Sequence, residues 1–89
     1  AERLAKAGLE WMRLPLKAKD LVGRGRWLDE KAVLASLIRA RTGVRNAWVA
    51  DRLGMGMEGN VTRAVRRVRE EKRLGRMLKD CERMLEKRD

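Results

Sequence analysis

The stretch Arg45–Glu70 reads RNAWVADRLGMGMEGNVTRAVRRVRE and decides the fold. In its second half, apolar residues recur at Val61, Ala64, Val65 and Val68, which is the i, i+3, i+4, i+7 spacing of one helix face. From Val61 to Glu70, arginines occupy four of the six remaining positions. The pattern therefore predicts a helix with a buried valine stripe and an outer surface of guanidinium groups.

The first half of the stretch predicts a shorter helix that packs against the second. Asn46 is a good N-cap, and the apolar residues that follow it face inward up to Gly54. The segment 54–60 contains three glycines and predicts a turn. A helix, a glycine-containing turn and a helix with a basic outer face, here over about 46–70, form the helix-turn-helix arrangement that places one helix in the DNA major groove. The turn is one or two residues longer than in the common short form.

Two further helical segments precede this stretch. A stripe beginning at Leu4 predicts a helix over 2–14 that Pro15 ends, with one or two more turns before a glycine-rich loop over 23–27. Asp29 predicts the N-cap of the next helix, and Gly43 a left-handed residue just beyond its end. The expected buried stripe of that helix comprises Val33, Leu34, Leu37 and Ile38.

The C-terminal part predicts one more helix after a break over 70–73. Its apolar positions keep helical spacing at Leu74, Met77, Leu78, Cys81, Met84 and Leu85. We favour this stripe as part of the core, with a homodimer seam as the alternative. The sequence as a whole predicts an all-α single domain over 1–89, a small bundle of four to five helices. Trp11 and Trp48 are expected in the core, and Trp27, beside a loop, is expected to cover the core edge, with stacking on a base as the alternative.

Composition excludes several classes of protein. The chain has 89 residues and a formal net charge of +10, with 23 Lys or Arg against 13 Asp or Glu. It has no histidine and a single cysteine, so we expect no catalytic residues, no metal site, no cofactor and no internal disulfide. No apolar run is long enough to span a bilayer, so we expect no membrane partner and a cytoplasmic, nucleoid-associated location. Because the chain starts at Ala1, we expect it to be part of a longer protein.

The positive charge is concentrated in the stretch 63–76, which holds seven basic residues against two acids. Arginine suits bidentate contacts with phosphate and with guanine edges. We therefore expect a nucleic acid, with DNA preferred, as the partner. The residues expected to face base edges or groove phosphates are Asn60, Thr62, Arg63 and Arg66, and those expected to hold the backbone are Arg45, Arg67, Arg69 and Arg73.

The same stretch resembles the C-terminal region of the REP-associated tyrosine transposases, in which a W-[IV]-A-x-R-L-x-M-G core precedes the recognition helix. That core corresponds here to Trp48, Val49, Ala50, Arg52, Leu53, Met55 and Gly56, and the segment 28–43 is similar to the helix that precedes it. The family's catalytic domain uses histidines and a tyrosine, and neither residue type occurs in this chain. The resemblance thus implies a non-catalytic, accessory DNA-binding domain of a transposase-like protein.

Two other functions remain open from the residues alone. An RNA-binding module would use the same arginines on a structured hairpin. A protein-interaction or oligomerisation module would instead use the apolar stripe of 74–85. We expect DNA binding over both.

Overall fold

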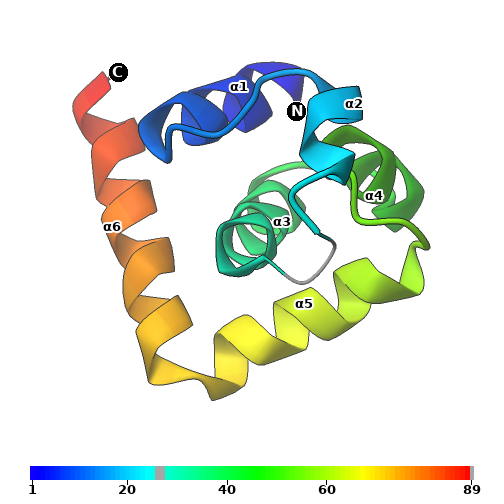
Figure 1. Ribbon diagram of the computed structural model, residues 1–89. Coiled ribbons are helices and arrows are strands. Elements are labelled where there is room, and N and C mark those ends of the chain that lie inside the picture. The colour runs from blue at the N-terminus through cyan, green and yellow to red at the C-terminus, as the bar shows by residue number, and fades with distance from the viewer. Residues whose placement is uncertain (26–27, 89) are drawn as a thin grey trace.

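The computed structural model describes residues 1–25 and 28–88, and within these ranges the chain forms helices and no strand (Figure 1). The helices are α1 Glu2–Trp11, α2 Ala18–Val22, α3 Asp29–Arg41, α4 Asn46–Leu53, α5 Gly59–Glu70 and α6 Lys72–Arg88. The all-α prediction is confirmed, but the described part has six helices rather than four to five. The short α2 forms its own element, and extended backbone at Glu71 separates α5 from α6.

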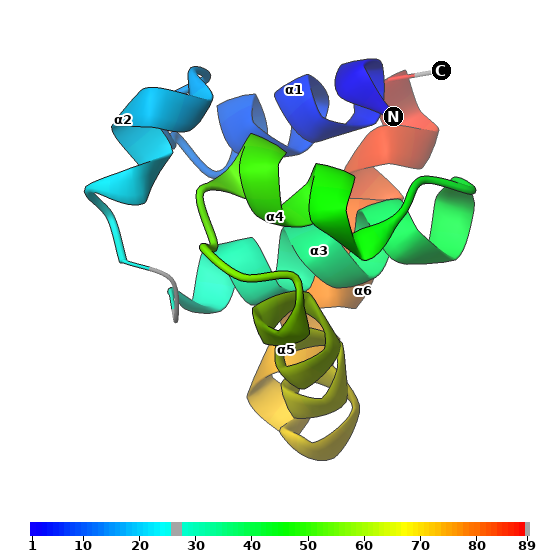
Figure 2. The same cartoon turned by 90° about the vertical axis from the view of Figure 1, so that its right-hand side faces the viewer.

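Helix α3 lies at the centre, with the other helices arranged around it (Figure 1). Every residue from Lys31 to Ile38 is buried, which goes well beyond the predicted stripe. A helix that is buried all round needs partners on every side, and α3 contacts α1, α4, α5 and α6. Helix α5 runs crosswise to α3 and α4, as the two perpendicular views show (Figures 1 and 2).

Helix α1 approaches α3 closely because Gly8 lacks a side chain. A Cβ atom at Gly8 would lie 2.3 Å from Cδ2 of the buried Leu34. Helix α1 ends at Trp11, whose side chain is 41% exposed, so the prediction that Trp11 is a core residue is wrong. Trp48 is partly buried against the core, and Trp27 lies outside the described residues.

The two predicted ends of α3 are both wrong in detail. Leu28 occupies the N-cap position, and Asp29 lies in the first turn with its carboxylate engaged elsewhere. At the other end the chain leaves the helix through the extended backbone of Thr42, whose hydroxyl donates to the Ile38 carbonyl at 2.8 Å. Gly43 therefore does not adopt the left-handed conformation, which Gly25, Gly54 and Gly56 do adopt.

Helix α4 ends at Gly54, and this glycine is required twice over. Its φ of +63° is left-handed, as is common after a helix C-terminus, and the Met55 N–H reaches back to the Ala50 carbonyl at 2.8 Å. In addition, a Cβ atom at Gly54 would lie 2.7 Å from the backbone nitrogen of Val22. The end of α2 thus packs directly on the turn that follows α4.

A buried lysine joins these elements. Lys31 of α3 is fully buried, and its ammonium group donates to the carbonyl oxygens of Leu21 and, at 2.9 Å, of Gly54. Burial lowers the pKa of Lys31 below its ordinary value, because the charged form loses hydration. The side chain holds the end of α2 and the turn after α4 onto the central helix.

The apolar stripe of α6 belongs to the core, as favoured from the sequence. Leu74, Cys81 and Leu85 are buried, and Met77, Leu78 and Met84 pack against the same cluster. This stripe is therefore covered within the chain itself. In the described part of the chain, no helix combines the length and the apolar character needed to cross a membrane.

Candidate nucleic-acid interface

Helix α5 has a buried side and an exposed basic side, as its sequence predicts. Val61, Ala64 and Val68 are at most 5% exposed and face α3. On the opposite side Arg63, Arg66 and Arg69 are exposed. Within the described residues these three side chains have no carboxylate partner, so their charges remain available to a ligand.

Asn60 does not lie on this exposed side, and its predicted outward orientation is wrong. The residue is 6% exposed, and its side-chain amide donates to the Met55 carbonyl at 2.8 Å. It thus closes the turn between α4 and α5. Met55 is itself fully buried, whereas Met57 in the same turn is 77% exposed.

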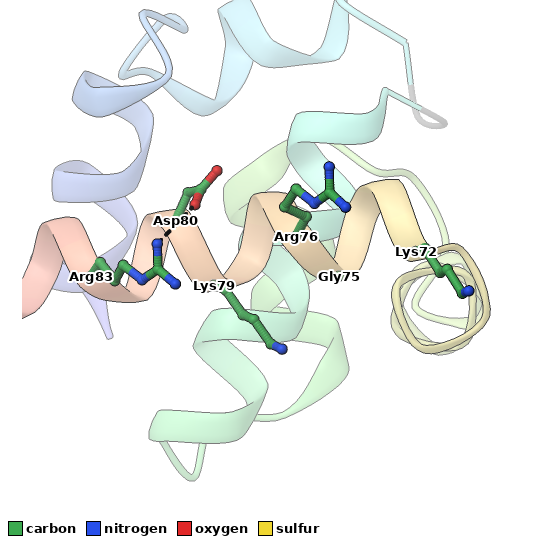
Figure 3. Close-up of a pocket in the computed structure, with 6 residues that line it drawn as sticks. All are labelled: Lys72, Gly75, Arg76, Lys79, Asp80 and Arg83. Atoms are coloured by element: carbon green, nitrogen blue, oxygen red, sulfur yellow. Dashed lines mark ion pairs between the residues drawn. The ribbon is translucent and has the colours of Figure 1, made fainter.

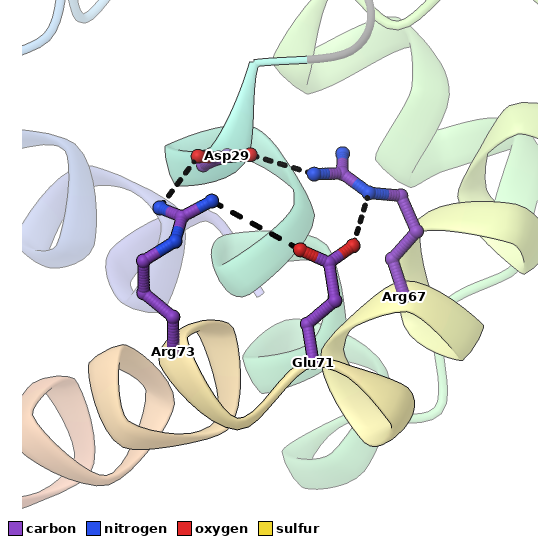
Figure 4. A network of polar contacts seen from close by, with 4 residues as sticks. All are labelled: Asp29, Arg67, Glu71 and Arg73. Carbon is purple, nitrogen blue, oxygen red and sulfur yellow. Dashed lines mark hydrogen bonds and ion pairs between the residues drawn. The ribbon is translucent and has the colours of Figure 1, made fainter.

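Arg67 and Arg73 differ from the other predicted backbone contacts, because carboxylates neutralise both (Figure 4). Asp29, in the first turn of α3, pairs with Arg67 at 2.6 Å and with Arg73 at 2.8 Å. Glu71, between α5 and α6, pairs with Arg67 at 3.2 Å and lies 3.9 Å from Arg73. We call these four residues the Asp29 network. It fastens the start of α3 to the junction of α5 and α6, so Arg67 and Arg73, which were expected to hold a nucleic-acid backbone, have carboxylate partners within the chain instead.

The electrostatics of the Asp29 network follow from these contacts. The hydrogen bond from Arg67, followed by that from Arg73, holds the pKa of Asp29 below its ordinary value. The bond to Asp29 also raises the pKa of Arg67. Each partner thus favours the charged form of the other, which is the behaviour of a structural ion-pair cluster.

A shallow groove lies on the other flank of α5, where it meets the end of α3 and the start of α4. Its lining residues are Arg39, Asn46, Thr62, Val65, Arg66 and Arg69, and we call it the α5 groove. Thr62 accepts a hydrogen bond from the Asn46 amide at 3.2 Å, which fixes the distance between α4 and α5 here. Three of the six lining residues are arginines, and none is acidic.

An adjoining hollow extends the groove toward α6 and shares Arg39, Val65 and Arg69 with it. Ser36 lies in this hollow, and its hydroxyl is buried without a hydrogen-bond partner in the described part of the chain. The same holds for the side-chain oxygen of Asn46 in the α5 groove. Buried polar atoms normally have partners, so both leave hydrogen-bonding capacity for water or a ligand.

Arg39 is a groove residue that sequence reasoning missed. Its guanidinium donates to the Val44 carbonyl at 2.7 Å, which holds the side chain beside the loop between α3 and α4. Its position in the last turn of a predicted helix, outside the apolar stripe, was the available signal. Arg45, which was predicted, is exposed immediately before α4.

Arg52, part of the motif that resembles the transposase family, has a structural role. Its Nε donates to the Glu2 carboxylate at 2.7 Å and so ties α4 to α1. The bond from Arg52 lowers the pKa of Glu2. Arg52 therefore does not belong to the α5 groove.

The described residues offer little for metal binding or nucleophilic chemistry. No group of three or more His, Cys, Asp or Glu side chains is close enough among them to hold a metal ion. Cys81 is fully buried in α6, and burial raises the pKa of its thiol to about 11. A buried thiol with that pKa is protonated at neutral pH and inert as a nucleophile.

Comparisons with protein-family models, with curated proteins and with solved structures gave no match for this chain. The resemblance to the REP-associated tyrosine transposases therefore rests on the sequence motif alone.

Proposed function

We propose that this chain is a non-catalytic DNA-binding domain in which α4, the connection 54–58 and α5 form a helix-turn-helix. Helix α5 would be the recognition helix, with its exposed side in the major groove. The sequence resemblance supports an accessory role in a transposase-like protein. A domain of this kind would act in the cytoplasm, associated with the nucleoid.

Three features of this region support the helix-turn-helix. Helix α4 ends on a left-handed glycine, Gly54, and Asn60 ties the start of α5 to this turn. Helix α5 packs across α3 and also contacts α4 (Figure 2). The three helices α3, α4 and α5 thus share one core while the outer side of α5 stays open.

The observation that carries the proposal is the exposure of Arg63, Arg66 and Arg69 without carboxylate partners among the described residues. Ion pairs on an ordinary solvated helix would use nearby acids, as Arg67 does. Free guanidinium groups beside a groove suit both phosphate oxygens and guanine edges. Arg39 and Arg45 lie at the flanking loop and would add backbone contacts.

The direct test measures binding of the chain to a fluorescent duplex by anisotropy over a range of salt concentrations. Four or more phosphate contacts would give a slope of log affinity against log salt of about −3.5 or steeper. A slope near zero would exclude nucleic-acid binding through these cations. Competition at equal salt by RNA hairpins and single-stranded DNA tests the kind of nucleic acid, and preferential displacement by RNA would contradict the DNA proposal.

A further inference from the structure

A second basic surface lies on α6, separate from the α5 groove. Lys72, Arg76, Lys79 and Arg83 follow one another at intervals of four, three and four residues, which places them on one side of the helix. Figure 3 shows these side chains along α6, and all four residues are exposed. We call them the α6 row. The buried Leu74, Cys81 and Leu85 lie on the opposite side of the same helix.

The α6 row lines a hollow of its own. Besides the four cations, only Gly75 and Asp80 line it. A Cβ atom at Gly75 would lie 3.5 Å from the backbone oxygen of Val68, so the helix passes close to the end of α5 here. The row covers about 16 Å along the helix axis, since an α-helix rises about 1.5 Å per residue.

The charges of the α6 row are poorly compensated within the described chain. Asp80 lies 3.8 Å from Arg83, and both side chains are at least half exposed, which makes the pair weak. Lys72, Arg76 and Lys79 have no ion pair with any described residue. Like charges three or four residues apart on a helix repel each other and destabilise it. The row therefore opposes folding slightly, whereas the core stripe and the ion pair between Arg73 and Asp29 hold α6 in place.

We propose that the α6 row binds the sugar-phosphate backbone of a nucleic acid, as a second contact beside the α5 groove. The inference rests on the proposed function. Each strand of B-DNA places about five phosphates along 16 Å of its axis, so the row faces a matching density of charge. Because α5 and α6 run in different directions from their junction, the two surfaces follow different stretches of backbone (Figure 1).

The lining of the hollow favours a phosphate backbone over a protein or a membrane. Protein interfaces bury aromatic and apolar residues at their centre, and lysine and acidic residues are depleted there. A helix that lies on a membrane needs an exposed apolar face. Among the residues that line this hollow, none is apolar apart from Gly75.

The test replaces the whole row at once, in the variant K72Q/R76Q/K79Q/R83Q. The matched control, R3Q/K17Q/K19Q/R24Q, removes the same number of lysines and arginines from exposed positions of the first two helices and their flanks. Circular dichroism and thermal unfolding establish that both variants are folded. Anisotropy with a fluorescent duplex of about 20 base pairs, over a range of NaCl concentrations, then gives the salt slope of each protein.

We expect the row variant to lose about 3.5 units of slope, because each of the four phosphate contacts contributes about 0.9, whereas the control changes by less than 1. Equal slopes for the two variants would overturn the α6 row as a contact. The proposed function fails in a different way, with a wild-type slope near zero. If polyglutamate binds the wild type but not the row variant while both proteins bind the duplex with equal salt slopes, the row is a site for acidic protein and the proposal is again overturned.

Discussion

The carboxylate of Asp29, in the first turn of α3, accepts a hydrogen bond from the guanidinium of Arg67 on α5 at 2.6 Å. This contact divides the arginines of α5 into two groups. Arg67 stabilises the junction of three helices through the Asp29 network, while Arg63, Arg66 and Arg69 stay exposed. The basic surface available to a ligand is therefore smaller than the charge of the segment suggests.

Replacement of Asp29 tests the network. We expect D29N to lower the free energy of unfolding by about 1–2 kcal/mol at pH 7, because two charge-assisted hydrogen bonds are weakened in a partly exposed site. The pKa of Asp29 is lower in the folded state than in the unfolded chain, where it is near 3.8. The stabilisation by the Asp29 carboxylate is therefore fully present above pH 3.8 and is lost as the pH falls through the pKa of the folded state. Urea unfolding of the wild type and D29N at pH 7 and near pH 2 measures the loss of stability and its dependence on pH.

The control for that experiment is D51N, at an exposed carboxylate of α4 without an ion pair among the described residues. We expect a change below about 0.5 kcal/mol for this surface substitution. Equal losses for D29N at both pH values would contradict the electrostatic role of Asp29.

Lys31 tests the buried polar link between α2, α3 and α4. We expect K31A to destabilise the fold by about 2–4 kcal/mol through the cavity it leaves, and K31M, which keeps the volume of the stem, to cost less. The pKa of Lys31 is lowered, so the folded state loses the proton first as the pH rises. Wild type should therefore gain stability relative to K31M between neutral pH and about pH 10. A constant difference over that range would contradict the burial of a charged ammonium group.

Gly54 and Gly56 separate backbone strain from close packing, since both have positive φ. G56A meets only the Asn60 amide, at 3.5 Å, and we expect a loss of about 1–2 kcal/mol from the left-handed conformation alone. G54A also meets the backbone of Val22 and should lose at least about 1 kcal/mol more. Thermal or urea unfolding of the two variants compares them directly, and equal losses would contradict the contact between α2 and the turn.

Cys81 reports on the packing of α6. Because its pKa is raised to about 11, we expect a thiol reagent to label the native protein far more slowly than the protein in urea. The effect of Cys81 on stability changes with pH in the opposite direction to that of Lys31. The folded state keeps the thiol proton longer than the unfolded chain, so the free energy of unfolding falls as the pH rises toward 11. The variant C81A should lack that decline. Rapid labelling of the native protein would place Cys81 outside the core.

Local patterns in the sequence predicted the helices well and their mutual contacts poorly. The valine stripe of α5 follows from residues three and four apart, which interact within one helix. The pair Asp29–Arg67 joins positions 38 residues apart, and only the packing of α5 on α3 brings them together. The sequence pattern for this reason predicts a capping role for Asp29 and a ligand contact for Arg67.

Two other differences have equally specific causes. Asn60 is a polar residue at the start of a helix, and the sequence is compatible with either an outward contact or a hydrogen bond to the turn. In the structure its side-chain amide donates to the Met55 carbonyl, and the side chain points inward. Arg39 became part of the α5 groove only through the way the end of α3 meets α5. Neither the inward orientation of Asn60 nor the place of Arg39 in the α5 groove can be predicted from the spacing of apolar residues along the sequence.

The most direct test of the central claim compares two double variants that remove the same charge from α5 and its surroundings. R66Q/R69Q removes exposed arginines of the α5 groove, and R67Q/R73Q removes the two arginines of the Asp29 network. We expect R66Q/R69Q to reduce the salt slope of duplex binding by about 2 units, and R67Q/R73Q to reduce it by less than about 0.5 while lowering stability. Equal reductions for the two, measured by anisotropy on folded protein, would show that only net charge matters and would contradict the account.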